Sequence, residues 1–98
     1  MAAKIKWSQR AIKQFDDAIA FIENDSVSNA EKFKKDILNE IDYLFKYPEN
    51  YSPDKYKINN DNSFRAFELH HYRISYRYVN DEVRIIRIRH TKMNPLDY

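Results

Sequence analysis

The sequence predicts a small α+β domain in which a helical hairpin packs on one face of an antiparallel sheet. Two stretches with helical periodicity occupy the first half of the chain, and three stretches rich in β-branched and aromatic residues follow closely in the second half. The expected order of elements is β-α-α-β-β-β. The 98 residues suit a single domain, residues 1–98, with one modest core.

The first strand and the first helix are predicted within residues 3–24. The segment AKIKW alternates between apolar and charged residues, which is typical of a short strand. Ser8 is a candidate N-cap, and Trp7 and Ile12 have the spacing of a hydrophobic staple. A period near 3.6 predicts an amphipathic helix over residues 9–24. Its apolar positions are Ala11, Ile12, Phe15, Ala18, Ile19 and Ile22.

A second, longer helix is expected after the break at NDS. Ser28 and Glu31 have the spacing of a capping box, which predicts the start of the helix. The helix should end near Tyr47, because the residue before Pro48 is disfavoured in helical geometry. Its buried stripe is predicted to contain Ala30, Phe33, Ile37, Ile41, Leu44 and Phe45. Two helices joined by so few residues should pack as an antiparallel hairpin.

Residues 48–63 are polar and aperiodic, and three strands are predicted to follow them. The chain has no glycine, so Asn and Asp should provide any turn with positive φ. A segment this long without regular structure indicates a functional loop. The strands FRAFEL, YRISYRYV and EVRIIRIRH cover residues 64–69, 72–79 and 82–90, and Asn80-Asp81 is a plausible two-residue hairpin turn.

Alternation along these strands predicts which side chains share a face. Residues 72, 74, 76 and 78 are apolar or aromatic and suit the helices, while Arg73, Ser75 and Arg77 lie on the other face. In the last strand, residues 83, 85, 87 and 89 should share one face. If the three strands align, Arg65 and Arg87 join Arg73 and Arg77 on an open, basic face.

Composition excludes several classes of site. The chain has no cysteine, so disulfides and thiolate metal sites are impossible. His70 and His71 would point to opposite faces of a strand, which makes them a poor metal pair, and we expect no metal and no cofactor. No segment has the length of a membrane span or the pattern of a signal peptide, so we expect a cytoplasmic protein that does not act at a membrane.

Charge is divided unevenly along the chain. Residues 1–54 hold 8 Lys or Arg against 10 Asp or Glu, whereas residues 55–98 hold 9 against 5. Six of the seven arginines lie in the second part. Because arginine binds phosphates and carboxylates with two donors at once, this asymmetry favours an anionic partner. The alternative is a solvated surface without a specific partner.

The ordered set of motifs resembles the RelE/ParE superfamily, the toxins of type II toxin–antitoxin systems. The set consists of a Trp-Ser pair opening the first helix, Tyr-Pro closing the second, and then Arg65, YRISYR, IIRIRH and Pro95. The resemblance extends from about Ile5 to Pro95. It implies a growth-inhibiting toxin, of the kind that stabilises plasmids, with a cognate antitoxin as partner. It also implies that operator DNA is contacted only through the antitoxin complex.

Two branches of the superfamily differ in their targets. The last strand with its short polar tail is similar to the ParE pattern, which Arg87 and His90 match, and this implies poisoning of DNA gyrase through protein contacts. The RelE pattern implies metal-independent cleavage of mRNA on the ribosome. Lys55 and Lys57, Arg65 and Arg87 match its first positions, but Tyr98 lies further from the last strand than that pattern has it. We therefore favour the ParE branch and leave open whether the chain is an enzyme.

RNA cleavage by its own 2′-hydroxyl needs a base, a cation at the phosphate and an acid. His90 is the candidate base or acid, because histidine exchanges protons near neutral pH. Arg65 and Arg87 are candidates to hold the phosphate, and Tyr98 to stack on a base or donate a proton. Further candidates for contacts with an anionic partner are Arg73, Arg77, Arg89, Lys92, Lys55 and Lys57.

Each candidate also has a structural interpretation. His90 would be a strand-end histidine bonded to the backbone, Arg87 an ion-pair partner of Glu68 or Asp97, and the two loop lysines merely solvated. The tyrosines at positions 43, 47, 51 and 56 are expected to pack rather than to stack on bases. A third functional possibility is a degenerate member of the superfamily that binds its partner without being toxic.

Overall fold

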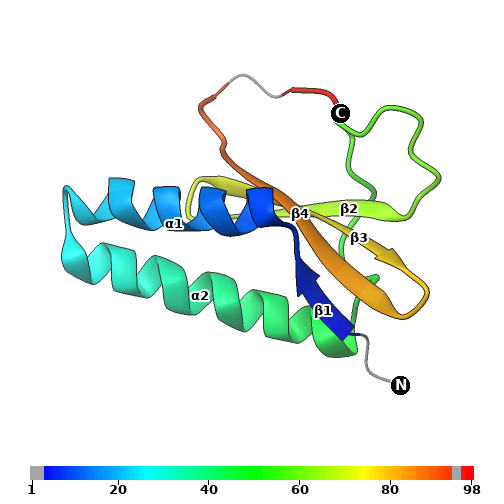
Figure 1. The fold of residues 1–98 in the computed structure, drawn as a ribbon, viewed down its shortest axis with the longest axis horizontal. Helices are drawn as coiled ribbons and strands as arrows, with labels where there is room; N and C mark the ends of the chain where they lie inside the picture. Colours follow the sequence, from blue (N-terminus) through cyan, green and yellow to red (C-terminus); the bar gives the residue numbers. More distant parts are fainter. Residues whose placement is uncertain (1–3, 94–95) are drawn as a thin grey trace.

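The structure, a computed structural model, describes residues 4–93 and 96–98, and its elements follow the predicted order. The helices are α1 (Gln9–Glu23) and α2 (Val27–Lys46), and the strands are β1 (Lys4–Trp7), β2 (Phe64–Leu69), β3 (Tyr72–Val79) and β4 (Glu82–His90). The two helices run antiparallel and cover one face of the sheet (Figure 1). No helix in the described ranges is long and apolar enough to cross a membrane. Pro95 lies outside these ranges.

The beginning of α1 confirms the predicted cap but not the predicted staple. The Ser8 hydroxyl accepts a hydrogen bond from the Ala11 N–H at 3.0 Å, which satisfies one of the free donors of the first turn. Trp7 packs on Phe15 with ring centroids 5.3 Å apart. Ile12 is 47% exposed, so the apolar contact of Trp7 falls one turn further along the helix than the staple spacing predicts.

The second helix begins two residues earlier than predicted. Ser26, not Ser28, is the N-cap, and its hydroxyl accepts from the Asn29 N–H at 3.1 Å. The predicted capping box of Ser28 and Glu31 is therefore wrong, because the Ser26 hydroxyl already accepts from a free N–H group of the first turn. The predicted end near Tyr47 is confirmed. Phe45 is 44% exposed rather than buried, since it lies about 100° around the helix from the buried Leu44.

The sheet is mixed rather than wholly antiparallel. Its order is β1-β4-β3-β2, and the three C-terminal strands pair antiparallel as predicted. β1 pairs parallel with β4 along the other edge of that strand. Beyond β1, the Ser8 hydroxyl donates to the Ile86 carbonyl at 3.0 Å, and the Gln14 side chain accepts from the Ile88 N–H at 2.7 Å. The start of α1 therefore satisfies the β4 edge that β1 leaves open.

A β-bulge in β4 overturns the predicted alternation of that strand. Ser75 pairs with Arg87 and Tyr76 with Ile85, so Ile86 has no partner on β3. The extra residue reverses the alternation. Residues 83, 85 and 88 all face the helices, while residues 84, 87 and 89 lie on the opposite face. The prediction that Val83 and Arg87 share a face is wrong for this reason.

Turns with positive φ occur mainly where Asn and Asp were expected. Asn80 and Asp81 have φ of 54° and 58° and form the predicted turn between β3 and β4. The turn between β2 and β3 is made by His70 and His71, with φ of 51° and 66°. These two histidines are therefore turn residues and not strand residues on opposite faces.

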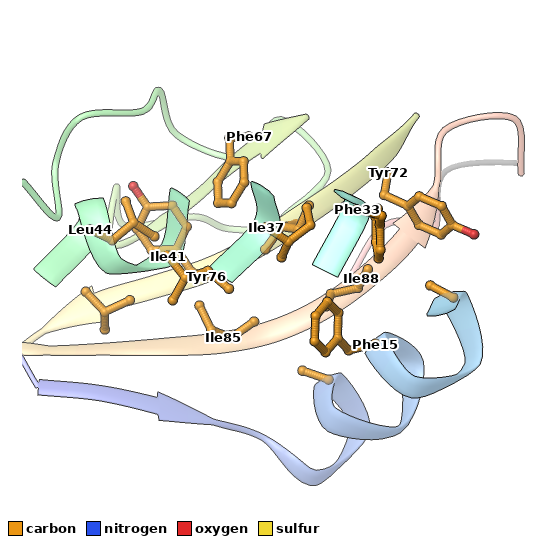
Figure 2. Close-up of a cluster of buried hydrophobic side chains, with 14 residues drawn as sticks. Phe15, Phe33, Ile37, Ile41, Leu44, Phe67, Tyr72, Tyr76, Ile85 and Ile88 are labelled. Carbon is orange, nitrogen blue, oxygen red and sulfur yellow. The ribbon is translucent and has the colours of Figure 1, made fainter. Parts of the chain in front are cut away.

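The core lies between the helical hairpin and the sheet (Figure 2). Phe33, Ile37 and Leu44 of α2 are almost completely buried against the sheet. Tyr76 lies at the centre of the β3 face, where it is fully buried, and its hydroxyl donates to the Pro48 carbonyl at 2.8 Å. The other buried apolar residues are Ala11, Phe15, Ala18, Ala30, Ile41, Phe67, Tyr72, Ile74, Val83, Ile85 and Ile88.

Candidate functional site

The sheet face away from the helices, predicted to be open, is partly closed by the loop of residues 48–63. The loop runs beside the free edge of β2, where the Asp54 N–H donates to the Phe64 carbonyl at 2.8 Å and Pro53 bridges to Arg65. From there the Asp54 side chain reaches over to β3. The end of the chain lies beside this loop in Figure 1. The candidate site therefore consists of the β3–β4 face together with the loop and the C-terminal tail.

Asp54 is the centre of this site. Its carboxylate is 2% exposed and accepts hydrogen bonds from Arg73 at 2.8 Å, the Ser75 hydroxyl at 2.8 Å and the Tyr98 hydroxyl at 2.6 Å. The Tyr56 N–H donates a fourth at 3.1 Å. Burial raises the pKa of Asp54, but these hydrogen bonds together outweigh it, so the pKa is below its ordinary value. The site therefore contains an ionised, buried carboxylate.

The C-terminal tail, which follows β4, reaches this site at Tyr98, where its backbone pairs with the loop. The Tyr98 N–H donates to the Tyr56 carbonyl at 3.0 Å, and the Tyr98 carbonyl accepts from the Ile58 N–H at 2.5 Å and from Lys57 Nζ at 3.2 Å. Burial raises the pKa of Tyr98, and its hydrogen bond to Asp54 acts in the same direction. Tyr98 is thus held neutral, with its hydroxyl proton engaged.

Arg87 is buried beneath the tail. It is 7% exposed, its Nη2 donates to the Leu96 carbonyl at 2.6 Å, and its Cζ lies 4.0 Å from the centre of the Tyr98 ring. Burial lowers the pKa of Arg87 from its ordinary value. Among the described residues no carboxylate forms an ion pair with Arg87. Of its two expected partners, Glu68 pairs with Arg73 at 2.9 Å, and Asp97 makes no ion pair with Arg87.

Arg65 does not share this face. It pairs with Tyr76 across the β2–β3 ladder and therefore lies on the side of the helices. Its guanidinium donates to the Tyr51 carbonyl at 2.6 Å and ties the loop to β2. The predicted alignment of Arg65 with Arg73 and Arg77 is wrong, because β2 is shifted by one residue relative to the assumed register.

His90 also lies on the side of the helices. It pairs with Tyr72 in the β3–β4 ladder, and the two rings meet edge to face with centroids 4.9 Å apart. Its Nδ1 accepts a hydrogen bond from the Lys92 N–H at 3.0 Å. This matches the structural interpretation of a strand-end histidine bonded to the backbone. The side chain of Lys92 is in an exposed part of the tail.

The remaining basic candidates pack on aromatic rings of the loop, β2 and the tail. Arg77 donates to the Ser63 hydroxyl at 3.0 Å and lies over the Phe64 ring at 4.8 Å. Lys55 is exposed, with its Nζ 5.2 Å from the Tyr56 ring centre. Lys57 lies between two aromatic rings, 4.7 Å from the centre of Phe64 and 5.4 Å from that of Tyr98. Lys57 and Arg77 thus share the Phe64 ring, and Lys57 and Arg87 share the Tyr98 ring.

A small cavity beside Arg87, which we name the arginine cavity, has a volume of about 60 Å³. Its lining residues are Tyr56, Glu68, Arg73, Ser75, Arg87, Arg89, His90, Thr91 and Met93. A larger groove of about 520 Å³ adjoins it between α1 and the end of β4. The groove is mainly apolar, with Phe21, Ala18 and Ile88 in its wall.

Sequence reasoning missed Asp54. It is one of several polar residues in an aperiodic loop, and nothing local marks it as the carboxylate that turns inward. Ser75 carried a weak signal, because it is the one small side chain between Arg73 and Arg77 on a basic face. A short hydroxyl there leaves room for the loop carboxylate to approach.

The fold points to the class of protein. A helical hairpin packed on a mixed four-stranded sheet is the fold that this chain shares with solved structures of a ParDE system and of the toxin RelE. The family described as "ParE toxin of type II toxin-antitoxin system, parDE" matches residues 5–95. The chain therefore belongs to the ParE toxin family.

Solved structures show the same fold. A chain of the chromosomal ParDE toxin–antitoxin system from P. aeruginosa aligns with a TM-score of 0.72 and 17% identity, over 93% of this chain and 98% of that chain. A mutant of the E. coli toxin RelE, in the free state, aligns with a TM-score of 0.55 and 17% identity, over 94% of this chain and 86% of that chain. No curated protein sequence matches this chain.

Proposed function

We propose that this chain arrests growth by poisoning DNA gyrase through protein contacts, and that a cognate antitoxin neutralises it. Membership of the ParE family supports the toxin role. The observation that carries the choice of target is that the residues proposed for RNA cleavage are separated or already engaged. Arg65 lies on the opposite face of the sheet from Arg87. His90 borders the same cavity as Arg87, but its ring packs on Tyr72 and its Nδ1 accepts a hydrogen bond from the Lys92 N–H. An engaged base, with its two candidate cations on opposite faces, is poorly arranged to act on one phosphate.

The test is inducible expression of the lone chain, with plasmid topology and mRNA lifetimes read from the same culture. We expect growth arrest with an altered topoisomer distribution and intact mRNA. Rapid loss of mRNA with unchanged topology would refute gyrase as the target. Continued growth with soluble protein present would instead favour a member that binds its partner without being toxic.

One observation favours mRNA cleavage as a second candidate function. Tyr98 is eleven positions after Arg87 in sequence, yet its ring lies 4.0 Å from the Arg87 guanidinium carbon. The Tyr–Arg pair that the RelE pattern needs is thus close in space. Its phenol, however, donates to Asp54 at 2.6 Å and would have to leave that carboxylate to donate a proton elsewhere.

Variants separate these two candidates. If the chain cleaves mRNA, Arg87→Ala and Tyr98→Phe should each lengthen mRNA lifetimes toward those of uninduced cells. If it poisons gyrase, mRNA lifetimes do not depend on these residues. Arg84→Ala, on the same strand but paired with Glu82 at 3.2 Å, is the matched control for loss of an arginine.

A further inference from the structure

The arginine cavity is a small, partly open pocket of about 60 Å³. This exceeds the ~10–15 Å³ that one water needs on this measure of cavity volume, so the cavity has room for a small group such as a carboxylate. The cavity is bordered by β2, β3, β4, the loop and the first residues of the tail, so it is formed only when these five segments are assembled.

The charge around the cavity is unbalanced. Arg73 accounts for both nearby carboxylates, because it pairs with Asp54 at 2.8 Å and with Glu68 at 2.9 Å. Arg87 is buried with no carboxylate partner among the described residues. In addition, the Nε of Arg73 is buried and has no hydrogen-bond partner within residues 4–93 and 96–98. Buried cations and donors are stabilised by an anion that accepts from them.

The shape of the site favours a single anion over a nucleic acid strand. A strand needs a row of accessible cations that follow its phosphates, with aromatic faces for the bases. Here Arg77 is held by Ser63, and Arg65 is turned to the other face. The loop and the tail contact the β3–β4 face that a strand would follow, and the arginine cavity lies beside them.

We propose that the arginine cavity binds the carboxylate of one Asp or Glu side chain presented by a protein partner. Arginine suits this role because its fork of donors matches the two oxygens of a carboxylate. The apolar groove shares Arg89, His90 and Met93 with the cavity, so the acidic residue of the partner lies next to apolar residues that enter the groove. The assignment to a protein partner rests on the proposed protein-directed function.

The test observes the arginine side chains directly. In a ¹⁵N-labelled chain, the Nε–Hε signals of Arg73 and Arg87 are followed by NMR during titration with three capped ligands. These are N-acetylglutamate amide, its glutamine counterpart and dimethyl phosphate, which represent a carboxylate, an uncharged isostere and a phosphodiester. We expect saturable shifts with the glutamate ligand and none with the other two.

Variants locate the binding. Arg87→Gln should weaken glutamate binding by at least about tenfold, because it removes the buried partner of the carboxylate. Arg84→Gln, on the same strand but outside the cavity, should leave it unchanged. Since Arg87→Gln could lower stability, Thr91→Glu provides a second route. It places a carboxylate at the exposed rim of the cavity and should compete with the ligand without changing the core.

Three results would overturn the proposal: tighter binding of dimethyl phosphate than of the glutamate ligand, equal binding of the glutamine ligand, or no shift up to the solubility limit. The assay contains neither gyrase nor nucleic acid. If it fails while plasmid topology still changes in cells, the carboxylate site is rejected and the proposed function stands.

Discussion

At the scale of single residues, Asp54 has the greatest structural consequence. It connects β3, the loop and the tail through three side-chain hydrogen bonds, at 2.8, 2.8 and 2.6 Å. Hydrogen bonds to a buried charge are stronger than those between neutral groups. A single carboxylate therefore joins the long loop and the end of the chain to the sheet, in addition to the contacts made by Arg65 and Arg87.

Asp54→Asn should lower the free energy of unfolding by about 3 kcal/mol, the typical result of breaking a buried ion pair on one side. The asparagine cannot accept from Arg73, Ser75 and Tyr98 with equal strength, and it leaves Arg73 with Glu68 alone. Urea unfolding at neutral pH measures the change. Asp42→Asn, an exposed carboxylate on α2, is the control and should change stability by less than about 0.5 kcal/mol. An equal effect of both variants would contradict the role of Asp54.

The dependence of the free energy of unfolding on pH follows from the pKa of Asp54. The pKa of Asp54 is lower in the folded chain than its ordinary value of 3.8, so the unfolded chain binds the proton more readily. This carboxylate therefore contributes its full stability above about pH 4, and the contribution is lost as the pH falls through the folded-state pKa. Asp54→Asn should unfold with a shallower dependence on pH below about 4 than the parent chain.

His71, unlike Asp54, is a residue type that does not suit its position, because its backbone conformation favours glycine. With φ of 66°, it occupies the left-handed region that glycine adopts without steric strain. His71→Gly should therefore stabilise the chain by about 0.5 kcal/mol, the net of relieved strain and added flexibility in the unfolded state. Thermal unfolding measures it. Lys35→Gly, at an exposed position of α2, should destabilise by about 1 kcal/mol and shows that glycine is not stabilising in general.

At the scale of elements, the bulge in β4 decides which arginines reach the site. If Ile86 were paired with β3 instead of bulged, the strand would alternate strictly, and Arg87 and Arg89 would point into the core beside Val83 and Ile85. The core would then contain unpaired charges. The bulge allows a strand with both apolar and basic runs to bury one and to present the other on the opposite face.

Deletion of Ile86 should therefore give a folded chain with a regular β4, because Ile85 and Arg87 then follow one another and keep their partners on β3. Insertion of one alanine between Arg87 and Ile88 should prevent folding, because it exchanges the faces of Ile88 and Arg89. Circular dichroism and the dispersion of NMR signals distinguish the two variants. A folded insertion variant would mean that β4 can absorb a further residue and that its register does not decide where the arginines lie.

The elements themselves were predictable because each has a local signal. Helical periodicity, the Ser8 cap and the apolar strands predicted five of six elements nearly to the residue, and α2 began two residues early because Ser26 competes with Ser28 for the cap. The register and the bulge were not predictable, since strict alternation gives no sign of an inserted residue. The site depends on the register and the bulge. The sequence therefore predicted its arginines, but it did not predict Asp54 or the face of the sheet on which Arg65 and His90 lie.

At the scale of the whole molecule, the arginine-rich half of the chain does not produce an open basic surface. Arg73 is neutralised by Asp54 and Glu68, and Arg77 is held by Ser63 and lies 3.8 Å from Asp61. The excess of positive charge in residues 55–98 is thus used largely to assemble the loop and the tail on the sheet. Net charge read from sequence overestimates the charge available to a partner.

This arrangement predicts weak binding to single-stranded RNA. Each phosphate neutralised on a single strand contributes about −0.7 to the slope of log affinity against log salt. With its arginines engaged internally, the chain should contact no more than about two phosphates, which gives a slope no steeper than about −1.5. Fluorescence anisotropy with a labelled RNA oligonucleotide at several salt concentrations measures it. A slope of about −4 would correspond to about six phosphates. It would show that the loop and tail open to expose the β3–β4 face, and mRNA would then become the better candidate target.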